Sequence, residues 1–303
     1  MRIAIMGSGA TGTYYGAKLA RAGYDVLFVA RGAHLDALQT KGLSVVGQEE
    51  FHLPHVQATN APAAVGPVDL ILFCVKAYDT DEAARLIQPL VGPETVVLPI
   101  QNGVDNVERI GSLIGPEHLI GGLCRISVDI PQPGTVRLNS PFKEIIFGEM
   151  NGSPSARTAA IARMLERAEI PHKLSGDIRK EIWNKFTFIT AMSGITGATR
   201  LPIGPIREVA EAYDLYGKIA AEVVAVGRAE GVDLDRHLPD ELMAQGRALA
   251  AGLKASLLVD LERGRRTEVE TLQGAVVRLG RKHGIPTPVT DVIYALLKVH
   301  QPR

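Results

Sequence analysis

The first sixteen residues, MRIAIMGSGATGTYYG, constrain the fold more strongly than any other stretch of the chain. A short buried strand is predicted at Arg2–Met6, followed by a G-x-G-x-x-G turn and a helical stretch from Thr13 to Ala22. This order is typical of a dinucleotide-binding unit, whose helix N-terminus faces the phosphates. The alternative is a glycine-rich turn that binds nothing. The residues predicted to bind the cofactor are Gly7, Ser8, Gly9, Ala10, Thr11 and Gly12.

The three glycines have different roles in this pattern. Gly7 permits the tight turn, and Gly9 lets a pyrophosphate approach the backbone. Gly12 lets the helix pack closely on the strand.

Length and composition limit the classes of protein that fit. The 303 residues suggest about two domains, and the formal net charge of zero implies no nucleic-acid or acidic-surface partner. Only two cysteines, Cys74 and Cys124, are present, so we predict neither a disulfide framework nor a metal site. No signal peptide is predicted, because the N-terminal apolar stretch is short and runs straight into the glycine turn. No membrane span is predicted, because no uninterrupted apolar segment approaches the length of one. We therefore expect a cytoplasmic protein with no membrane partner.

The end of the second predicted strand, Asp25–Ala30, indicates which dinucleotide binds. In an NAD-binding unit this strand usually ends in an acid that holds the ribose 2′-hydroxyl. Here Arg31 and Gly32 follow the strand, and Asp36 is placed on the next helix, Ala33–Lys41. A guanidinium suits a 2′-phosphate, which it can hold with two hydrogen bonds. We predict NADPH/NADP⁺ rather than NADH, and the alternative is an exposed loop arginine.

Alternating strands and helices predict a doubly wound parallel sheet followed by a β-rich tail. The predicted strands are 68–75, 95–100, 118–130, 135–147 and 171–174, with a hairpin or short excursion at 42–58. The predicted helices are 79–90, capped by Asp79, and then 104–114 and 155–168.

Two polar residues follow strands of this predicted sheet. Lys76 follows the strand at 68–75, and Asn102 follows the strand at 95–100. Ligands of such sheets bind at the carboxyl ends of the strands, where the glycine turn also lies. Lys76 is predicted to reach a phosphate or the substrate, and Asn102 the nicotinamide ribose or the substrate. The alternatives are a solvated lysine and a turn asparagine before glycine.

From about Ser175 the pattern becomes almost entirely helical. We place the boundary near residues 170–178, which gives an N-terminal domain at 1–175 and a helical domain at 176–303. The predicted helices are 178–196, 206–231, 239–261 in one or two pieces, 267–283 and 287–300.

One charge is out of place in the first of these helices. The stripe formed by Ile178, Ile182, Lys185, Ile189 and Ser193 contains a lysine among apolar residues. Burial lowers the pKa of an ammonium group, which suits a proton donor working near neutrality. The alternatives are a helix pair with Glu181 and a side chain that reaches solvent. On their own, Glu268 in a first helical turn and Ser256 carry no functional signal.

Taken together, these features resemble the ketopantoate reductase (2-dehydropantoate 2-reductase) family over nearly the whole chain. The matching stretches are GSGATG at 7–12, Arg31, VKAYDT at 75–80, QNGVDNVE at 101–108, EIWNK at 181–185, ASLLVD at 255–260, RRTEVETLQG at 265–274 and HGIPTP at 283–288. The resemblance implies an N-terminal Rossmann domain and an all-helical C-terminal domain similar to that of 6-phosphogluconate dehydrogenase. It implies an active site in the cleft between them, and homodimerisation through the helical domain is compatible with such folds.

The resemblance also implies the reaction, which is NADPH-dependent reduction of 2-dehydropantoate to pantoate in pantothenate synthesis. Lys185 corresponds to the catalytic lysine, Glu268 to the active-site glutamate and Ser256 to the substrate-binding serine. Asn102 is expected to help position cofactor and substrate, and Lys76 to lie near the adenosine phosphates or the nicotinamide.

The chain departs from the family where the substrate is recognised. Family members carry asparagines at positions where this chain has Ile189, Ser193, Ile203 and Gln273. Of these replacements, we keep Ser193 as a candidate substrate-binding residue. The two isoleucines are expected to make the wall of the site more apolar, which favours a different 2-oxo acid or ketone as an alternative substrate. A further alternative is a non-catalytic NADP-binding sensor.

Overall fold

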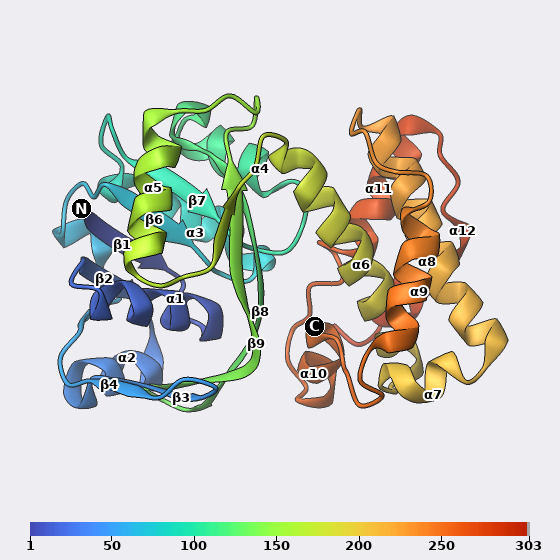
Figure 1. Ribbon diagram of the computed structural model, residues 1–303, viewed down its shortest axis with the longest axis horizontal. Helices are drawn as coiled ribbons and strands as arrows, with labels where there is room; N and C mark the ends of the chain where they lie inside the picture. Colours follow the sequence, from blue (N-terminus) through green and yellow to red (C-terminus); the bar gives the residue numbers. More distant parts are fainter. Residues whose placement is uncertain (302–303) are drawn as a thin grey trace. The chain divides into compact units, whose positions relative to one another are not determined.

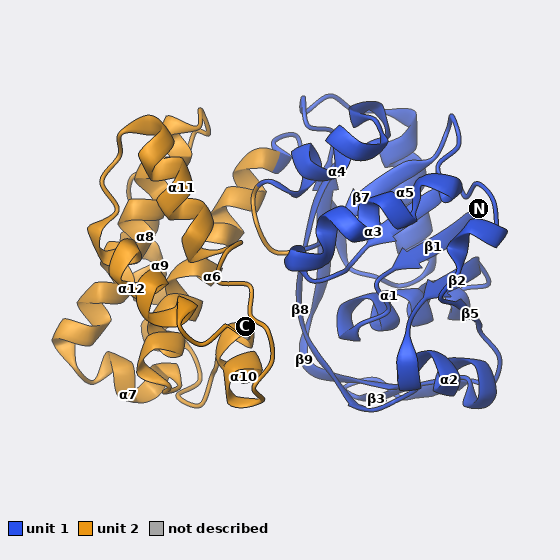
Figure 2. Cartoon of the chain, turned by 180° about the vertical axis from the view of Figure 1, so that it is seen from behind, with its two compact units in different colours: residues 1–101, 105–178 blue, residues 102–104, 179–303 orange. Residues whose placement is uncertain are grey.

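The computed structural model describes residues 1–301, and the contacts within it divide the chain into two compact units (Figures 1 and 2). Unit 1 comprises residues 1–101 and 105–178, and unit 2 comprises residues 102–104 and the chain from Arg179 onward. Unit 1 mixes helices with a parallel sheet, whereas unit 2 is helical, so the predicted fold class is confirmed. Residues 302 and 303 of the predicted helical domain lie outside the described part.

A five-stranded parallel sheet forms the centre of unit 1. The strand order is β5-β2-β1-β6-β7, and every neighbouring pair is parallel. The predicted strand at Arg2–Met6 is confirmed, and the strands predicted at 25–30, 68–75 and 95–100 are one to four residues shorter than predicted. The strands are β1 (Arg2–Met6), β2 (Asp25–Val29), β5 (Gln57–Thr59), β6 (Leu70–Phe73) and β7 (Val96–Pro99).

Helices cover both faces of this sheet, which is why its central strands, β2, β1 and β6, are mostly apolar. Ile3 and Ile5 of β1 pack in one core cluster with residues of α1 and α5. Ala4 and Met6 point the other way, into a cluster with residues of α3 and α4. The helices are α1 (Ala10–Arg21), α2 (Gly32–Lys41), α3 (Thr80–Leu86), α4 (Asn106–Ile114) and α5 (Ala156–Arg167). Short 3-10 turns lie at η1 (Pro62–Ala64), η2 (Ala77–Asp79), η3 (Gln88–Leu90) and η4 (Pro116–His118).

A second sheet is built around a long antiparallel hairpin of two strands, β8 and β9 (Figure 1). The other edge of β9 pairs with β3 near its start and with β10 near its end. The predicted excursion at 42–58 is partly a hairpin, β3 with β4, while its last residues enter the parallel sheet as β5. The strands are β3 (Leu43–Gly47), β4 (Phe51–Leu53), β8 (Gly121–Gln132), β9 (Thr135–Gly148) and β10 (His172–Leu174).

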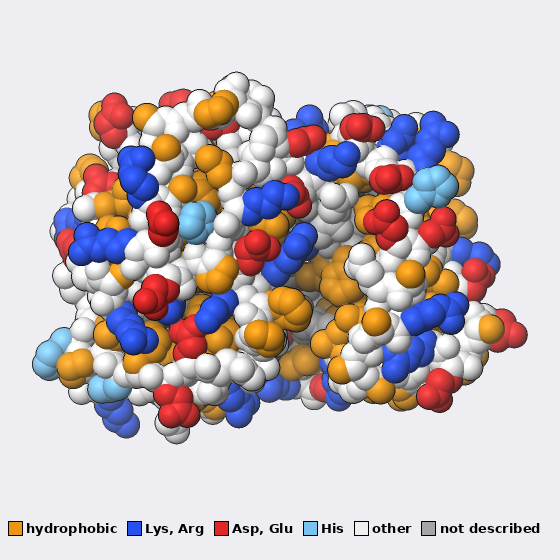
Figure 3. Space-filling model, in the orientation of Figure 1, with side chains coloured by type: hydrophobic (Ala, Val, Ile, Leu, Met, Phe, Trp, Pro, Cys, Tyr) orange, Lys and Arg blue, Asp and Glu red, His pale blue; other side chains and the backbone are white. Residues whose placement is uncertain are grey.

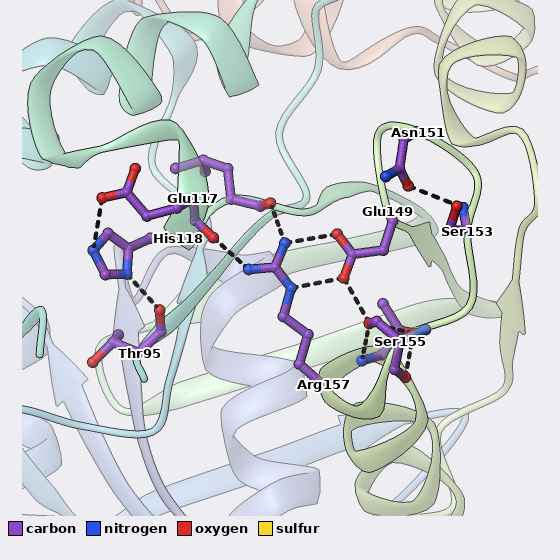
Figure 4. Close-up of polar contacts among 10 residues, drawn as sticks. Thr95, Glu117, His118, Glu149, Asn151, Ser153, Ser155 and Arg157 are labelled. Atoms are coloured by element: carbon purple, nitrogen blue, oxygen red, sulfur yellow. Dashed lines mark hydrogen bonds and ion pairs between the residues drawn. The ribbon is translucent and has the colours of Figure 1, made fainter. Parts of the chain in front are cut away.

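An ion pair fixes the end of β9 to the start of α5 (Figure 4). Arg157 donates from Nε and Nη2 to the two carboxylate oxygens of Glu149, at 2.7 and 2.6 Å. The same guanidinium also donates to the backbone oxygens of Glu117 and Leu119. These hydrogen bonds from Arg157 hold the pKa of the Glu149 carboxyl below its usual range. Ser155 caps α5, as its predicted start implies.

Unit 2 is a set of helices (Figure 2). They surround one core, which includes the buried side chains of Trp183, Tyr216 and Val276. The predicted helix at 206–231 is divided, because Val209 is extended between two helices. The predicted segment at 239–261 forms two helices. The helices are α6 (Ile178–Thr199), α7 (Ile203–Arg207), α8 (Ala210–Ala229), α9 (Leu238–Ala248), α10 (Ser256–Glu262), α11 (Gln273–His283) and α12 (Pro288–Lys298). Among the described residues, no helix has the length and hydropathy that crossing a membrane requires.

The prediction of one helix over 267–283 is wrong at its start. The helix begins only at Gln273, because Leu272 has φ −94° and ψ −90°, outside the helical region. The amides of Thr271 and Leu272 both donate to the backbone oxygen of Glu268, which forms a turn rather than a regular helix. Glu268 therefore lies in a turn before the helix and is not a residue of a first helical turn.

Candidate functional site

The first and third glycines of the turn are required by its backbone geometry. Gly7 has φ +94°, and a Cβ there would lie 2.6 Å from a side-chain carbon of Val75 and 2.7 Å from its backbone nitrogen. A Cβ on Gly12 would lie 2.3 Å from the backbone oxygen of Gly7. Both positions thus exclude any larger residue, in agreement with the tight turn and close helix packing that the sequence predicts.

Gly9 differs from the other two, because a Cβ there would meet nothing within 4 Å. It is the N-cap of α1 and supplies no side-chain cap, so the first amides of the helix keep their hydrogen-bonding capacity. The neighbouring Ser8 is 6% exposed, and its hydroxyl oxygen has no hydrogen-bond partner in the protein. Open space, uncapped amides and an unpartnered hydroxyl fit an anionic group such as a pyrophosphate. The helix starts at Ala10, three residues earlier than predicted, so Ala10, Thr11 and Gly12 form its first turn.

A histidine that the sequence analysis did not single out supports this turn. The Nδ1 atom of His34 accepts from the amide of Gly134 at 3.1 Å, so the ring proton is assigned to Nε2. Nε2 lies 3.1 Å from the hydroxyl of Thr13, which donates to the backbone oxygen of Ser8 at 2.9 Å. Burial lowers the pKa of His34. The partners lie 21 and 100 residues from His34, so no local pattern could have revealed them.

Arg31 and Lys76 lie in loops after two strands that flank β1 in the sheet. The Arg31 side chain is 81% exposed, and its Nη2 atom lies 3.1 Å from Oδ2 of Asp79. Lys76 is half-buried at the start of η2. The prediction that Asp79 caps the following helix is wrong, because its side chain makes no cap hydrogen bond and pairs with Arg31 instead.

Asn102 and Glu268 are brought together within unit 2. The Nδ2 atom of Asn102 donates to Oε2 of Glu268 at 3.1 Å, although 166 residues separate the two. The Glu268 side chain is 5% exposed, and a buried carboxylate needs such donors to offset the loss of water. A role in the site was predicted for each residue separately, but this contact was not predicted.

The other two predicted residues of unit 2 have different environments. Lys185 is half-buried in α6, where the neighbouring Phe186 is buried in the helical core. Ser256 is the first residue of α10 and is exposed to solvent. A hydroxyl at a helix start and a half-buried ammonium are both accessible to a small polar ligand.

The predicted substrate-facing positions contain a hydrogen-bonded pair. The Nε2 atom of Gln273 donates to the hydroxyl of Ser193 and to the backbone oxygen of Thr190, both at 2.9 Å. Ser193 is 1% exposed and Gln273 is fully buried. The Ser193 hydroxyl is thus already an acceptor for a side chain 80 residues away in the sequence.

The expectation that both isoleucines line the site is wrong for Ile203. Its side chain is fully buried in the helical core, and its amide donates to the backbone oxygen of Leu253 at 3.0 Å. Ile189 is only half-buried. Of the two isoleucines that replace family asparagines, only Ile189 is therefore exposed enough to contact a ligand.

Charges of both signs are interspersed on the face of the molecule that Figure 3 shows. Lysine and arginine side chains lie beside aspartate and glutamate side chains over most of that face (Figure 3).

Two family models match the chain. Residues 3–152 match "Ketopantoate reductase PanE/ApbA", and residues 177–301 match "Ketopantoate reductase PanE/ApbA C terminal". A 2-dehydropantoate 2-reductase of Mesorhizobium japonicum is 33% identical and covers 98% of this chain and 97% of its own length. An uncharacterized oxidoreductase of Bacillus subtilis, YkpB, is 28% identical and covers 99% of both chains. The solved structure of 2-dehydropantoate 2-reductase from Geobacter metallireducens has a TM-score of 0.92 and 31% identity, and it covers 99% of both chains.

The two models together span almost the entire described chain, so the fold and the sequence point to one class, a two-part reductase of the α/β type. The chain belongs to the ketopantoate reductase family.

Proposed function

We propose that the chain is an NADPH-dependent reductase that converts a 2-oxo acid to a 2-hydroxy acid, with 2-dehydropantoate as the first candidate substrate. One observation carries the proposal. Asn102 and Glu268, which the sequence analysis assigned to the site separately, are hydrogen-bonded in a chain that matches both parts of the family. Relatives whose names state 2-dehydropantoate 2-reductase activity support the choice of substrate.

In this proposal the dinucleotide lies along the carboxyl edge of the parallel sheet. The amides from Gly9 to Gly12 hold the pyrophosphate, and the uncapped start of α1 and the Ser8 hydroxyl support this role. Arg31 holds the 2′-phosphate, because a guanidinium matches phosphate geometry. Lys76 takes a position near the phosphates or the nicotinamide, and Asn102 helps to place the nicotinamide ribose.

Bound NADPH would supply the hydride that the carbonyl carbon of the substrate accepts. The ammonium of Lys185 donates a hydrogen bond to the carbonyl oxygen and gives up its proton as negative charge develops there, so the product carries a hydroxyl. General acid catalysis of this kind typically contributes about 10²–10⁴-fold in rate. Glu268 orients the substrate or keeps Lys185 charged, and Ser256 binds the substrate carboxylate.

A second candidate substrate is a 2-oxo acid with a more apolar side chain. The observation that favours it is the hydrogen bonding of Gln273, whose amide is taken up by Ser193 and Thr190. The donor side of that amide is thus used inside the helical core and is not available to a hydroxyl of the substrate. Ile189, half-buried, would then present an apolar surface to the substrate.

The remaining proposals concern the setting of the enzyme. We place it in the cytoplasm, in pantothenate synthesis and as a homodimer. Light scattering on the purified chain measures the dimer directly, and growth of a strain lacking the gene with and without added pantothenate tests the pathway. A monomeric mass would contradict the dimer, and normal growth without pantothenate would contradict the pathway.

The proposed reaction is tested by steady-state kinetics with the purified protein. The assay follows NADPH oxidation with 2-dehydropantoate and with branched 2-oxo acids that lack its hydroxyl, and repeats each with NADH. The highest kcat/KM is expected for NADPH with 2-dehydropantoate, whereas a higher value for the apolar acids would favour the second candidate. Tight NADPH binding without turnover of any ketone would indicate a sensor instead of an enzyme.

A further inference from the structure

The ion pair between Arg31 and Asp79 joins two loops on either side of the glycine turn. Arg31 follows β2 and Asp79 follows β6, and these two strands are the immediate neighbours of β1. All three strands are parallel, so the loops that follow them lie at the same edge of the sheet. The pair therefore spans the position at which the β1 strand passes into the glycine turn.

The two partners differ in how freely they can move. The Arg31 side chain is 81% exposed, whereas the Asp79 side chain is 25% exposed. Arg31 can thus turn to another acceptor without loss of packed contacts. Asp79 occupies the N-cap position of α3 without a side-chain cap hydrogen bond, so its carboxylate is committed to Arg31 rather than to the helix.

We infer that Asp79 is a specificity-determining residue for the dinucleotide, because its carboxylate competes with a 2′-phosphate for the guanidinium of Arg31. This inference rests on the proposed use of NADPH. A 2′-phosphate carries more negative charge than a carboxylate and accepts two hydrogen bonds from a guanidinium, so it displaces Asp79. A ribose 2′-hydroxyl carries no charge and leaves the ion pair intact. Asp79 therefore weakens binding of NADPH while leaving binding of NADH nearly unchanged, and so reduces the preference for NADPH over NADH.

The size of the effect follows from the exposure of the pair. Exposed ion pairs typically contribute up to about 1 kcal/mol, which corresponds to about fivefold in affinity. Because the competition is between solvent-exposed charges, added salt screens it. Loss of the Asp79 carboxylate is thus expected to strengthen binding of a 2′-phosphorylated ligand by about two- to fivefold at low salt, and by less at high salt.

The test is calorimetric titration of the whole protein with two ligands that lack the nicotinamide, so no turnover enters the measurement. The ligands are 2′,5′-ADP, which carries the 2′-phosphate, and 5′-AMP, which does not. Asp79→Asn should bind 2′,5′-ADP more tightly than the unmodified protein and bind 5′-AMP with unchanged affinity. The control is Asp81→Asn, which removes the same charge two residues away from a carboxylate paired with Arg109 at 2.8 Å. It should change neither affinity.

A double-mutant cycle separates this inference from the proposed function. If Asp79 acts through Arg31, the gain from Asp79→Asn disappears in an Arg31→Ala background. Equal or weaker binding of 2′,5′-ADP by Asp79→Asn overturns the inference, as does an equal gain from Asp81→Asn, and both leave the use of NADPH standing. If Arg31→Ala alone leaves the affinity for 2′,5′-ADP unchanged, the choice of NADPH fails and the inference fails with it.

Discussion

The glycine turn of unit 1 and the candidate residues of unit 2 are built in opposite ways. The turn offers backbone amides from consecutive residues between β1 and α1, and its glycines shape the space around them. In unit 2 the groups are side chains from separate segments, namely the loop after β7, α6, the start of α10 and the turn before α11. A site made of backbone depends on one short pattern, whereas a site made of side chains depends on how the whole helical core packs. Substitutions in the glycine turn are therefore expected to act by steric overlap, whereas substitutions in unit 2 are expected to act by removing a chemical group.

The largest expected effect concerns the chemistry of unit 2. Replacement of Lys185 by alanine should lower the single-turnover rate of hydride transfer by about 10²–10⁴-fold, because the proton donor is lost. The affinity for NADPH, which we assign to the glycine turn, should stay the same. Stopped-flow measurement of NADPH oxidation with saturating 2-oxo acid gives the rate, and fluorescence titration gives the affinity.

Lys180 provides a matched control on the same helix. Its side chain is 39% exposed and lies 4.0 Å from Asp233, so Lys180→Ala should keep both the rate and the affinity. A Lys185→Ala variant that reacts at more than a tenth of the normal rate would remove Lys185 from its proposed role. A loss of NADPH affinity in Lys185→Ala would contradict the assignment of cofactor binding to the glycine turn and of catalysis to unit 2.

The second prediction compares two glycines of the same turn. Gly12→Ala places a Cβ 2.3 Å from the backbone oxygen of Gly7, and overpacking of this kind typically costs about 1–3 kcal/mol of folding stability. Gly9→Ala meets nothing within 4 Å and has a permitted φ of −72°, so the Tm should be unchanged. The new methyl group would occupy the space proposed for the pyrophosphate, and NADPH affinity should fall by about tenfold.

Thermal unfolding and NADPH titration of both variants distinguish folding from binding. A stable Gly9→Ala variant that binds NADPH normally would show that no phosphate approaches this part of the backbone. A Gly12→Ala variant with an unchanged Tm would show that the turn relaxes around the extra carbon.

The same contrast explains how much the sequence could predict. The strand at Arg2–Met6, the glycine turn and the helix after it follow from hydrophobic runs and glycine spacing, which are local properties. The turn that holds Glu268 was predicted as helix, because the apolar residues from Val269 onward follow helical spacing. Its bond to Asn102 could not be predicted, since it depends on a residue 166 positions away. Asp79 was predicted as a helix cap from its place before a helical stretch. Its ion pair with Arg31 could not be predicted, because it depends on which strands are neighbours in the sheet.

The third prediction tests whether Ser193 belongs to the site or to the core. In Ser193→Ala the Nε2 atom of buried Gln273 keeps Thr190 as an acceptor and loses the hydroxyl, so we expect a loss of about 1 kcal/mol in stability. If the hydroxyl serves only this bond, kcat/KM stays the same. A loss of kcat/KM for one 2-oxo acid, with stability intact, would place the hydroxyl at the substrate.

Gln273→Leu supplies the partner variant for Ser193→Ala. Coupled stability effects in the double variant would confirm that the two side chains act as a pair, and additive effects would contradict it.

The smallest predicted effect, the pH dependence from His34, shows that the glycine turn is not supported by local residues alone. The folded state lowers the pKa of His34 below its ordinary value of 6.5 through burial, and Nδ1 is already used as an acceptor for the amide of Gly134. Protonation is therefore easier in the unfolded chain, so stability should be complete above about pH 6.5 and should decrease as the pH falls from there toward the folded-state pKa. Carboxyls whose pKa is lowered, such as Glu149, add stability that is complete above their ordinary value of 4.5 and is lost as the pH falls below it, in a separate window.

His34→Gln isolates this contribution, because glutamine can accept from Gly134 and donate to Thr13 but does not titrate. Between pH 6.5 and 5 the unmodified protein should lose about 1–3 °C more in Tm than the variant does. An equal loss in both would mean that the histidine does not titrate in support of the turn. The loss in Tm should be smaller in unmodified protein saturated with NADPH than in protein without it, because a ligand held by the turn stabilises the conformation that His34 supports. A larger loss with NADPH bound would contradict this. In the expected order, with the smaller loss in NADPH-bound protein, the glycine turn depends on the His34 side chain mainly when no ligand is bound.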